Sequence, residues 1–189
     1  MLTKHLAQVR RRYSYRFLFM PGTIGSITWL SLNRERTVAI RHGLALTRVG
    51  DCGHVTYKRS RQGDALIDRA MTHVLKHSGQ PYDIQDFSPC GYDERQYCSP
   101  VFNLPVGCLM RTPHGKFPEY HSSADNLELM RPASLADSFA KCLSAFYVLE
   151  NSRSYLNQNP QCEPQLSKRG LYRSMGSHRD EKLQGTAML

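Results

Sequence analysis

Residues 13–32 read YSYRFLFMPGTIGSITWLSL, and this stretch decides the fold class. Its first part alternates aromatic and polar residues and then becomes continuously apolar, which predicts a buried strand over residues 13–20. A Pro-Gly pair interrupts the strand. Thr23 then has a side chain that commonly caps helices, so the spacing predicts a helix over residues 24–32. A strand that ends in a glycine turn and opens a helix is the βα unit of an α/β sheet.

The rest of the first 150 residues continues this alternation of strand and helix patterns. Short apolar stretches predict strands, and longer stretches with apolar residues three and four positions apart predict helices. The predicted strands cover residues 43–50, 54–58, 82–87 (an edge strand) and 104–111, and the predicted helices cover residues 64–77 and 134–149. The sequence therefore predicts a three-layer α/β fold, in which a mixed, mostly parallel sheet has helices on both faces.

The composition is that of one globular domain. The 189 residues carry a net charge of +9, with 40% hydrophobic and 22% charged residues. No apolar run reaches the length of about 18 residues that a membrane-spanning helix needs, and the basic start lacks the apolar core of a secretory signal. Six cysteines without a Cys-x-x-Cys pair are expected to be free thiols of a cytoplasmic protein.

The positive charge raises the question of a nucleic-acid partner. Basic residues are spread over residues 10–12, 34–61 and 168–169, without stacking aromatic residues on one face. A nucleic-acid partner is therefore not expected, and neither is a membrane. The arginine-rich start could mimic a transit peptide, although the end of an amphipathic helix explains it as well.

Two polar loops are the candidate positions for chemistry. The first contains Asp93 and Glu94, and the second, residues 119–126, contains His121 and Asp125. A metal hydrolase needs imidazole and oxygen ligands from several strand ends, and a carboxylate that takes a proton from the bound water. A carboxylate close to a ligand histidine can also orient its imidazole ring. The two loops therefore suit a metal-hydrolase site.

Four stretches, in this order, resemble one known family. They are YSYRFLFMPGTIGSITWL at residues 13–30, YDERQYCSP at 92–100, FNLPVG at 102–107 and YHSSADN at 120–126. Together they resemble the aminopeptidase-like proteins often linked to polysaccharide biosynthesis in bacteria, which are similar in turn to zinc-dependent exopeptidases. The resemblance covers about residues 2–175. It implies a zinc-exopeptidase-like fold, zinc as the cofactor, and a metal-dependent hydrolase that takes a peptide or amide small molecule and cleaves N-terminal peptide or amide bonds.

The resemblance also implies roles for particular residues. His121 matches the late histidine ligand of the zinc exopeptidases, and Asp51 lies roughly where those enzymes have a ligand aspartate, so both are predicted metal ligands. Asp93 and Glu94 fall in the family's loop before the last core strand and are the predicted catalytic residues, with Asp93 shaping the site rather than binding metal. Relatives can carry a glutamate where this sequence has Gly22.

Other parts of the family pattern have no counterpart. The family's early histidine and bridging aspartate precede the strand that begins at Tyr13, and its C-terminal module, which resembles a winged helix, is expected to be cut off near Leu189. The resemblance thus implies truncation at both ends, with residues 1–150 as the C-terminal part of the α/β domain and residues 151–189 as a tail leading to the truncated module. With two ligands missing, the chain is expected to bind zinc weakly and to lack turnover.

Simpler roles stay open for each candidate residue. His121 can be a loop histidine bonded to Asp125, and Asp51 can be an ordinary turn residue. The two carboxylates of the first loop can belong to a turn and pair with Arg95. For the whole chain, the alternative to a hydrolase is a non-catalytic fragment or binding protein of the same fold that lacks a complete metal site.

Overall fold

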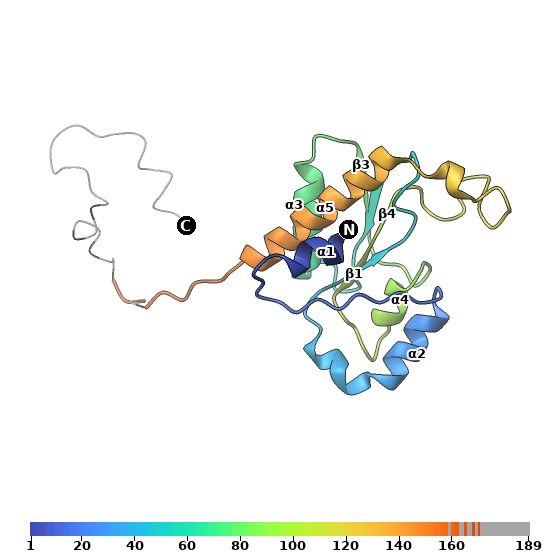
Figure 1. The fold of residues 1–189 in the computed structure, drawn as a ribbon. Coiled ribbons are helices and arrows are strands. Elements are labelled where there is room, and N and C mark those ends of the chain that lie inside the picture. Colours follow the sequence, from blue (N-terminus) through green and yellow to red (C-terminus); the bar gives the residue numbers. More distant parts are fainter. Residues whose placement is uncertain (159, 163–164, 166–167, 169, 171–189) are drawn as a thin grey trace. The chain divides into compact units, whose positions relative to one another are not determined.

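The computed structural model describes residues 1–158, 160–162, 165, 168 and 170. The chain divides into two compact units, Met1–Ser152 and Arg153–Leu189. All the helices and strands named below belong to the first unit (Figure 1). The predicted tail over residues 151–189 falls largely outside the described residues, so its extended conformation stays a prediction.

A four-stranded sheet with the strand order β1-β4-β2-β3 forms the centre of the first unit. Its strands are β1 (Gly43–Leu46), β2 (Val55–Lys58), β3 (Tyr82–Gln85) and β4 (Val106–Met110). β1 is parallel to β4 and β2 is parallel to β3, whereas β2 and β4 are antiparallel. The predicted mixed, mostly parallel sheet is therefore confirmed, with the predicted edge strand at one edge.

The first face of the sheet is covered by α3 (Leu66–Lys76) and α5 (Pro132–Asn151), which pack against each other. Tyr57 of β2 and Leu109 of β4 lie opposite each other in the ladder and point into this layer. Both side chains are completely buried, together with Met71 and Leu75 of α3. Burial of apolar surface on this scale is the main stabilising contribution to the fold.

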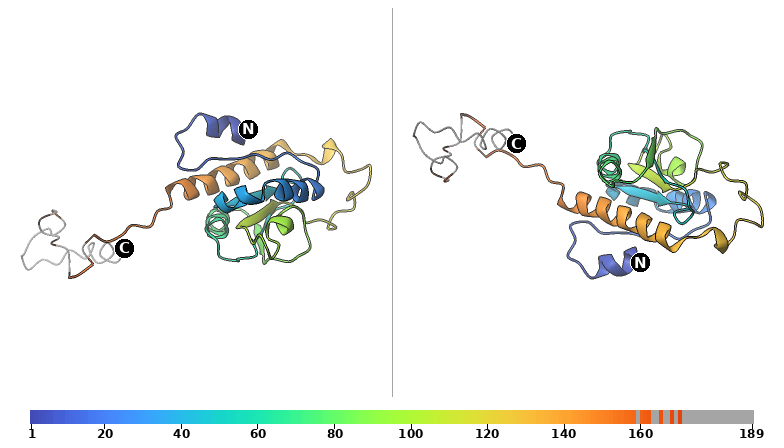
Figure 2. Two further views of the ribbon diagram at one scale, coloured as in Figure 1. Left: turned by 90° about the horizontal axis from the view of Figure 1, so that it is seen from below. Right: turned by 90° about the horizontal axis from the view of Figure 1, so that it is seen from above.

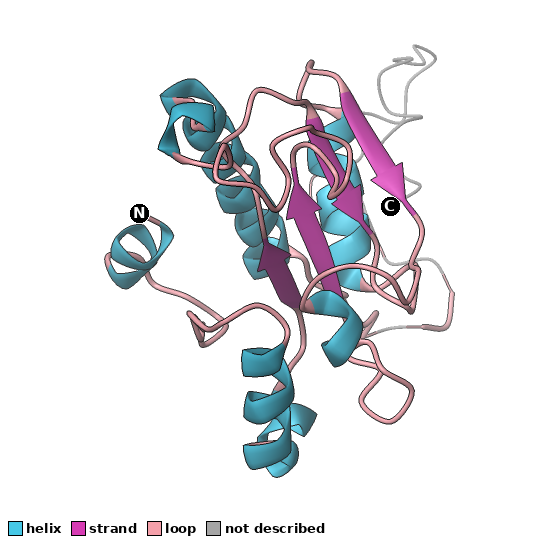
Figure 3. Ribbon diagram, turned by 90° about the vertical axis from the view of Figure 1, so that its right-hand side faces the viewer, coloured by secondary structure: helices cyan, strands magenta, loops and turns pink. Residues whose placement is uncertain are grey.

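The second face is covered by α2 (Ile24–Leu32) and α4 (Glu94–Tyr97). Val106 points to this side because side chains alternate along β4, and it forms a second core cluster with Leu30 and Tyr97. Figure 3 shows helices on either side of the strands. The predicted three-layer arrangement is confirmed.

The start of the chain lies along α5 (Figure 2). In α1 (Leu2–Ala7), Leu6 is buried. Leu2 packs against the core between the sheet and helices α3 and α5, which includes Tyr57 and Leu109. Further on, the hydroxyl group of Tyr15 donates a hydrogen bond of 2.8 Å to Glu150 of α5. Two short 3-10 helices, Arg34–Ala39 and Leu127–Leu129, complete the unit. No helix in the described part of the chain is long and apolar enough to cross a membrane.

The predicted strand over residues 13–20 is wrong. The segment is extended, but no described strand pairs with it, and the main chain of residues 14–20 makes no hydrogen bond to any described residue. Phe19 is 91% exposed. An apolar run indicates that a segment suits a sheet, whereas a strand also needs neighbours that accept and donate its main-chain hydrogen bonds.

Candidate functional site

The carboxyl ends of β1 and β4 meet at one edge of the sheet because these two strands are parallel. Ligands of open α/β sheets bind at such ends. Arg48 follows β1 with a φ of 45°, a left-handed conformation that is uncommon for a residue with a side chain. The amide of Arg111, just after β4, donates a hydrogen bond of 3.1 Å to the Arg48 carbonyl. This bond holds the turn after β1 next to the residues that follow β4.

The guanidinium group of Arg48 lies among three aromatic rings. Its Cζ is 5.3 Å from the ring centre of Tyr92, 5.5 Å from that of Phe117 and 5.6 Å from that of Tyr120. Aromatic faces at this range attract a cation, most strongly when water is excluded. We refer to Arg48, Tyr92, His114, Phe117 and Tyr120 as the Arg48 cluster.

Two nitrogens of the Arg48 guanidinium lack a hydrogen-bond acceptor in the part of the chain that the structure describes. Nε and Nη1 are shielded from solvent and have no partner among the described residues. Nη2 lies 3.9 Å from the sulfur of Met110, which is a weak acceptor. A shielded neutral donor without an acceptor costs about 1–3 kcal/mol, and a charged donor costs more. A ligand oxygen that reaches these nitrogens would remove that cost.

His114 adds a neutral imidazole to the cluster. Its ring centre is 6.1 Å from that of Tyr92 and 6.4 Å from that of Tyr120. Burial lowers the pKa of His114, and the positive charges of Arg48 and Lys58 lower it further. The ring is therefore neutral near pH 7. Its Nδ1 is buried and has no partner in the described part of the chain, so it can take part in one hydrogen bond with a ligand.

The loop that closes over Arg48 is held mainly by its own turns. Across residues 113–126, the main-chain hydrogen bonds join residues of the same loop, such as Lys116 to Pro113 and Tyr120 to Phe117. No main-chain bond between this stretch and the sheet occurs among the described residues. The hydrogen bonds of the sheet therefore do not involve the main chain of this loop in the described structure.

Glu94 belongs to a buried ion pair. Its Oε1 lies 2.9 Å from Nζ of Lys58, and the two side chains are 0% and 4% exposed. Lys58 also donates a hydrogen bond of 2.8 Å to the carbonyl of Ser88. The amide of Tyr92 donates to both carboxylate oxygens, at 3.3 and 3.1 Å. Glu94 thus pairs with Lys58 rather than with Arg95, and it holds the loop that brings Tyr92 to Arg48.

Asp93 holds the N-terminus of α2. Its Oδ1 accepts hydrogen bonds from the amide of Thr23 (3.1 Å) and the hydroxyl group of Ser26 (2.6 Å). The predicted capping by the side chain of Thr23 is wrong, because Thr23 has a φ of 48° and makes no capping bond. A carboxylate also suits the positive end of the helix dipole. Asp93 therefore fastens the first polar loop to α2.

Asp51 closes a turn and ties it to the end of β4. Its Oδ1 accepts hydrogen bonds of 2.8 Å from the amide of Gly53 and from the hydroxyl group of Thr112. Both carboxylate oxygens also lie 3.3 Å from the Thr112 amide. This is the turn role that the sequence left open. Both short hydrogen bonds go to Oδ1, whereas Oδ2 has only the 3.3 Å contact with the Thr112 amide.

His121 stacks on Tyr120, with ring centres 3.9 Å apart and an angle of 17° between the rings. It is exposed and has a φ of 58°. No hydrogen bond joins it to Asp125 in the described structure; the Asp125 amide instead donates to the Ser122 carbonyl (3.1 Å). His121 therefore contacts the Arg48 cluster at Tyr120.

The four predicted site residues do not form one ligand set. Glu94 is paired with Lys58, Asp93 with α2, and Asp51 with Thr112. Among the described residues, no group of three or more His, Cys, Asp or Glu side chains is placed to hold a metal ion. In this arrangement the residues do not fit a four-coordinate zinc ion. Their catalytic and metal-binding roles stay predictions.

Sequence patterns provide little indication of the Arg48 cluster. Tyr92 and Tyr120 lie beside predicted site residues, but Arg48 is one of many arginines and His114 is not part of a motif. The available signal was positional: Arg48 comes near the end of one predicted strand, and His114 comes shortly after another. Residues that follow neighbouring parallel strands meet at one edge of a sheet.

Comparison with known proteins gives the class of this fold. A protein of Clostridium acetobutylicum, described as a candidate polysaccharide biosynthesis protein with an aminopeptidase-like domain, is 52% identical over 187 residues. The crystal structure of a candidate peptidase from the same organism has a TM-score of 0.81 at 53% identity, over 89% of this chain and 40% of that chain. The first unit is therefore an aminopeptidase-like domain of the α/β class.

Two further structures are similar in fold alone. LapA aminopeptidase of Legionella pneumophila has a TM-score of 0.53 at 16% identity, over 69% of this chain and 36% of that chain. An aminopeptidase from Aneurinibacillus sp. strain AM-1 has a TM-score of 0.53 at 16% identity, over 72% of this chain and 32% of that chain.

The chain belongs to the family described as domain of unknown function DUF4910, whose model matches residues 1–152. A winged helix-turn-helix model matches residues 153–189. The alignment with the curated Clostridium protein covers 99% of this chain and 43% of that protein. The chain thus spans less than half the length of this relative.

Proposed function

We propose that this aminopeptidase-like domain binds a peptide, or an amide of similar size, at the Arg48 cluster. One observation carries the proposal: Nε and Nη1 of Arg48 are shielded from solvent and have no acceptor among the described residues, at the carboxyl ends of β1 and β4. A peptide has the oxygens that such donors need, and its apolar side chains can pack on the rings of Tyr92 and Tyr120.

The charge of the cluster favours a ligand with a free carboxylate. Arg48 has no acidic partner in the described structure, and the nearby ion pair of Lys58 and Glu94 is neutral overall. Nε of Arg95 is a further buried donor without an acceptor among the described residues. Charge-assisted hydrogen bonds from arginine to a carboxylate are roughly twice as strong as neutral ones. The proposed ligand is therefore a short peptide whose C-terminal carboxylate lies against Arg48.

Binding of leucyl-leucine is expected to depend on Arg48. The Arg48→Met variant removes the donors and the charge, and is expected to weaken binding by about tenfold or more, because a hydrogen bond to a charged group contributes about 1.5–3 kcal/mol. Isothermal titration calorimetry measures both proteins, and leucyl-leucinamide, which lacks the carboxylate, serves as the control ligand. Equal affinity of wild type and Arg48→Met for leucyl-leucine would contradict the proposal.

We propose in addition that metal-dependent hydrolysis of N-terminal peptide bonds, as the resemblance implies, requires ligands beyond His121 and Asp51. An exposed imidazole and a carboxylate already bonded to Thr112 supply at most two of the three protein ligands that a catalytic zinc ion takes. Such a site has to lower the pKa of bound water to about 7. His121 and Asp51 are not arranged to do this by themselves.

The 189-residue chain is therefore expected to bind zinc weakly and to show no turnover of leucyl-anilide. Zinc titration by calorimetry measures the affinity, and release of the aniline measures the activity. His121→Ala is expected to leave both results unchanged. Tight one-to-one zinc binding with turnover, lost in His121→Ala, would show that this chain assembles a complete centre and would refute the proposal.

A further inference from the structure

The thiol of Cys90 lies beside the imidazole ring of His114. Its sulfur is 3.9 Å from Nε2 of His114, within the range of a weak hydrogen bond that involves sulfur. Cys90 is also an exposed free cysteine, so small molecules can reach its sulfur. An accessible thiol next to a base is the arrangement that reactive cysteines have in proteins.

The loop that carries Cys90 is fixed from its buried side. Nζ of Lys58 donates hydrogen bonds to the carbonyl groups of Cys90 and Ser88. Lys58 is only 4% exposed and is paired with Glu94. Gly91 follows Cys90, and a Cβ at this position would lie 2.1 Å from Oε1 of Glu94. The buried ion pair therefore holds the main chain of Cys90 in place, and glycine is the residue that fits next to it.

His114 is suited to accept the proton of the Cys90 thiol. Its imidazole is neutral near pH 7, because burial and the charges of Arg48 and Lys58 lower its pKa. Nε2, which faces the sulfur, accepts a hydrogen when Nδ1 carries the ring proton. Transfer of the thiol proton to Nε2 leaves a thiolate, which is the nucleophilic form of cysteine.

The charge next to this pair favours a reaction partner that carries a carboxylate. The ring of Tyr92, two residues after Cys90, has the imidazole of His114 6.1 Å from its centre and Cζ of Arg48 5.3 Å from its centre. Arg48 has no acidic partner in the described part of the chain. A positive charge of this kind attracts anions and raises the rate at which they arrive.

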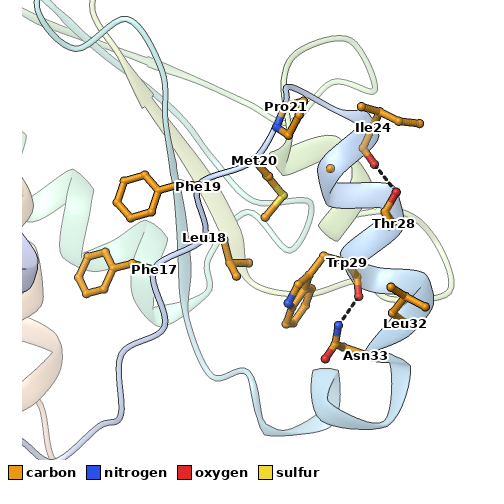
Figure 4. Close-up of a pocket in the computed structure, with 11 residues that line it drawn as sticks. Phe17, Leu18, Phe19, Met20, Pro21, Ile24, Thr28, Trp29, Leu32 and Asn33 are labelled. Atoms are coloured by element: carbon orange, nitrogen blue, oxygen red, sulfur yellow. Dashed lines mark hydrogen bonds between the residues drawn. The ribbon is translucent and has the colours of Figure 1, made fainter.

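The pocket beside α2 offers no comparable chemistry. Figure 4 shows its lining by residues 17–21 and by α2 with Asn33, and no titratable side chain of the described structure takes part in it. Its two polar side chains are bonded to their own helix. The Thr28 hydroxyl group donates to the Ile24 carbonyl and the Asn33 amide donates to the Trp29 carbonyl, both at 2.9 Å. A reactive small molecule is therefore not expected to be captured there.

We propose that Cys90 is a modification site that forms a mixed disulfide with a small, carboxylate-bearing peptide thiol, and that His114 acts as its general base. The co-reactant is the disulfide of that peptide thiol. As His114 takes the thiol proton, the Cys90 sulfur attacks one sulfur of the disulfide, so a new S–S bond forms and the old one breaks. The departing thiolate then receives the proton from the imidazolium. The preference for a carboxylate rests on the proposed function, whereas the reaction at Cys90 does not.

The first test compares Cys90 with Cys52, an exposed cysteine whose thiol contacts no histidine among the described residues. The protein is incubated with hydroxyethyl disulfide, a neutral probe, and mass spectrometry of peptides gives the rate at each cysteine. Cys90 is expected to react about tenfold faster or more near pH 6.5, because a general base assists it. Toward about pH 7.5 the rate at Cys52 should rise tenfold with its thiolate fraction, whereas that at Cys90 should change little, since neutral imidazole takes the proton throughout.

His114→Gln keeps a polar side chain but removes the base. It is expected to give Cys90 the rate and the pH dependence of Cys52, while the rate at Cys52 itself stays unchanged. Equal rates at the two cysteines in the wild-type protein would overturn the proposal. A faster rate at Cys90 that persists in His114→Gln would also overturn it.

The second test uses oxidised glutathione, whose two halves carry carboxylates. Arg48→Met is expected to slow its reaction with Cys90 by about tenfold, because the attracting charge is gone, and to leave the reaction with hydroxyethyl disulfide unchanged. Equal rates of wild type and Arg48→Met with oxidised glutathione would overturn the preference for a carboxylate. The neutral probe does not depend on Arg48, so its result stands or falls separately from the binding of leucyl-leucine.

Discussion

Replacing Glu94 with alanine is expected to lower the free energy of unfolding by about 3–5 kcal/mol, the range seen when one partner of a buried ion pair is removed. The reason is the position of Lys58, whose ammonium group would stay buried without its counter-charge. The Tyr92 amide would also lose its carboxylate acceptor. Urea denaturation of wild type and variant measures the difference.

Two controls separate the ion pair from general damage. The double variant Lys58→Met with Glu94→Leu removes both charges and is expected to be more stable than Glu94→Ala, because an apolar pair leaves no buried charge behind. Asp86→Ala removes the partner of Arg59 in a largely exposed pair and is expected to change stability little. A loss for Glu94→Ala no larger than that for Asp86→Ala would contradict this account of the ion pair.

Replacing Asp68 with alanine is expected to destabilise the fold by about 3 kcal/mol or more, since several buried donors would lose one acceptor at once. Asp68 is 1% exposed. Its carboxylate accepts hydrogen bonds from the hydroxyl groups of Tyr57 (2.8 Å) and Ser60 (2.6 Å) and from the amides of Ser60 (2.8 Å) and Ala65 (3.0 Å). Burial raises the pKa of Tyr57, and the charge of Asp68 raises it further, so this tyrosine donates at any ordinary pH.

A graded series tests the role of Asp68. Tyr57→Phe removes one of these donors and is expected to cost about 1–2 kcal/mol, well below the loss for Asp68→Ala. Thermal unfolding followed by circular dichroism gives the order of stability. If Tyr57→Phe were as damaging as Asp68→Ala, the bond from Tyr57 alone would account for the loss, and the donors of Ser60 and Ala65 would not contribute as proposed.

Periodicity in the sequence predicted most of the architecture because local pattern and burial agree there. α3 and α5 each have an apolar side that packs on the sheet, and β4 is buried along its whole length, as its apolar run indicates. The exception is the segment over residues 13–20. Its composition suits a strand, but pairing depends on neighbours, and local sequence carries no information about which neighbours are present.

The site was less predictable than the fold because its contacts join residues far apart in the sequence. Lys58 and Glu94 are buried together although 36 positions separate them. The turn role of Asp51 follows from the nearby Gly53 and was foreseen as an alternative, whereas its bond to Thr112 spans 61 positions. Short-range motifs therefore indicated which loops form the edge of the site, but they did not indicate Arg48.

The most direct test of the proposed binding site is the side-chain Nε–H resonance of Arg48 in an NMR titration with leucyl-leucine. Nε has no acceptor among the described residues, so a ligand oxygen that reaches it should deshield the proton. The expected result is a downfield shift that saturates with the same Kd as the calorimetric titration and is weaker or absent with leucyl-leucinamide. Saturating dipeptide binding that leaves this resonance unmoved would contradict the account.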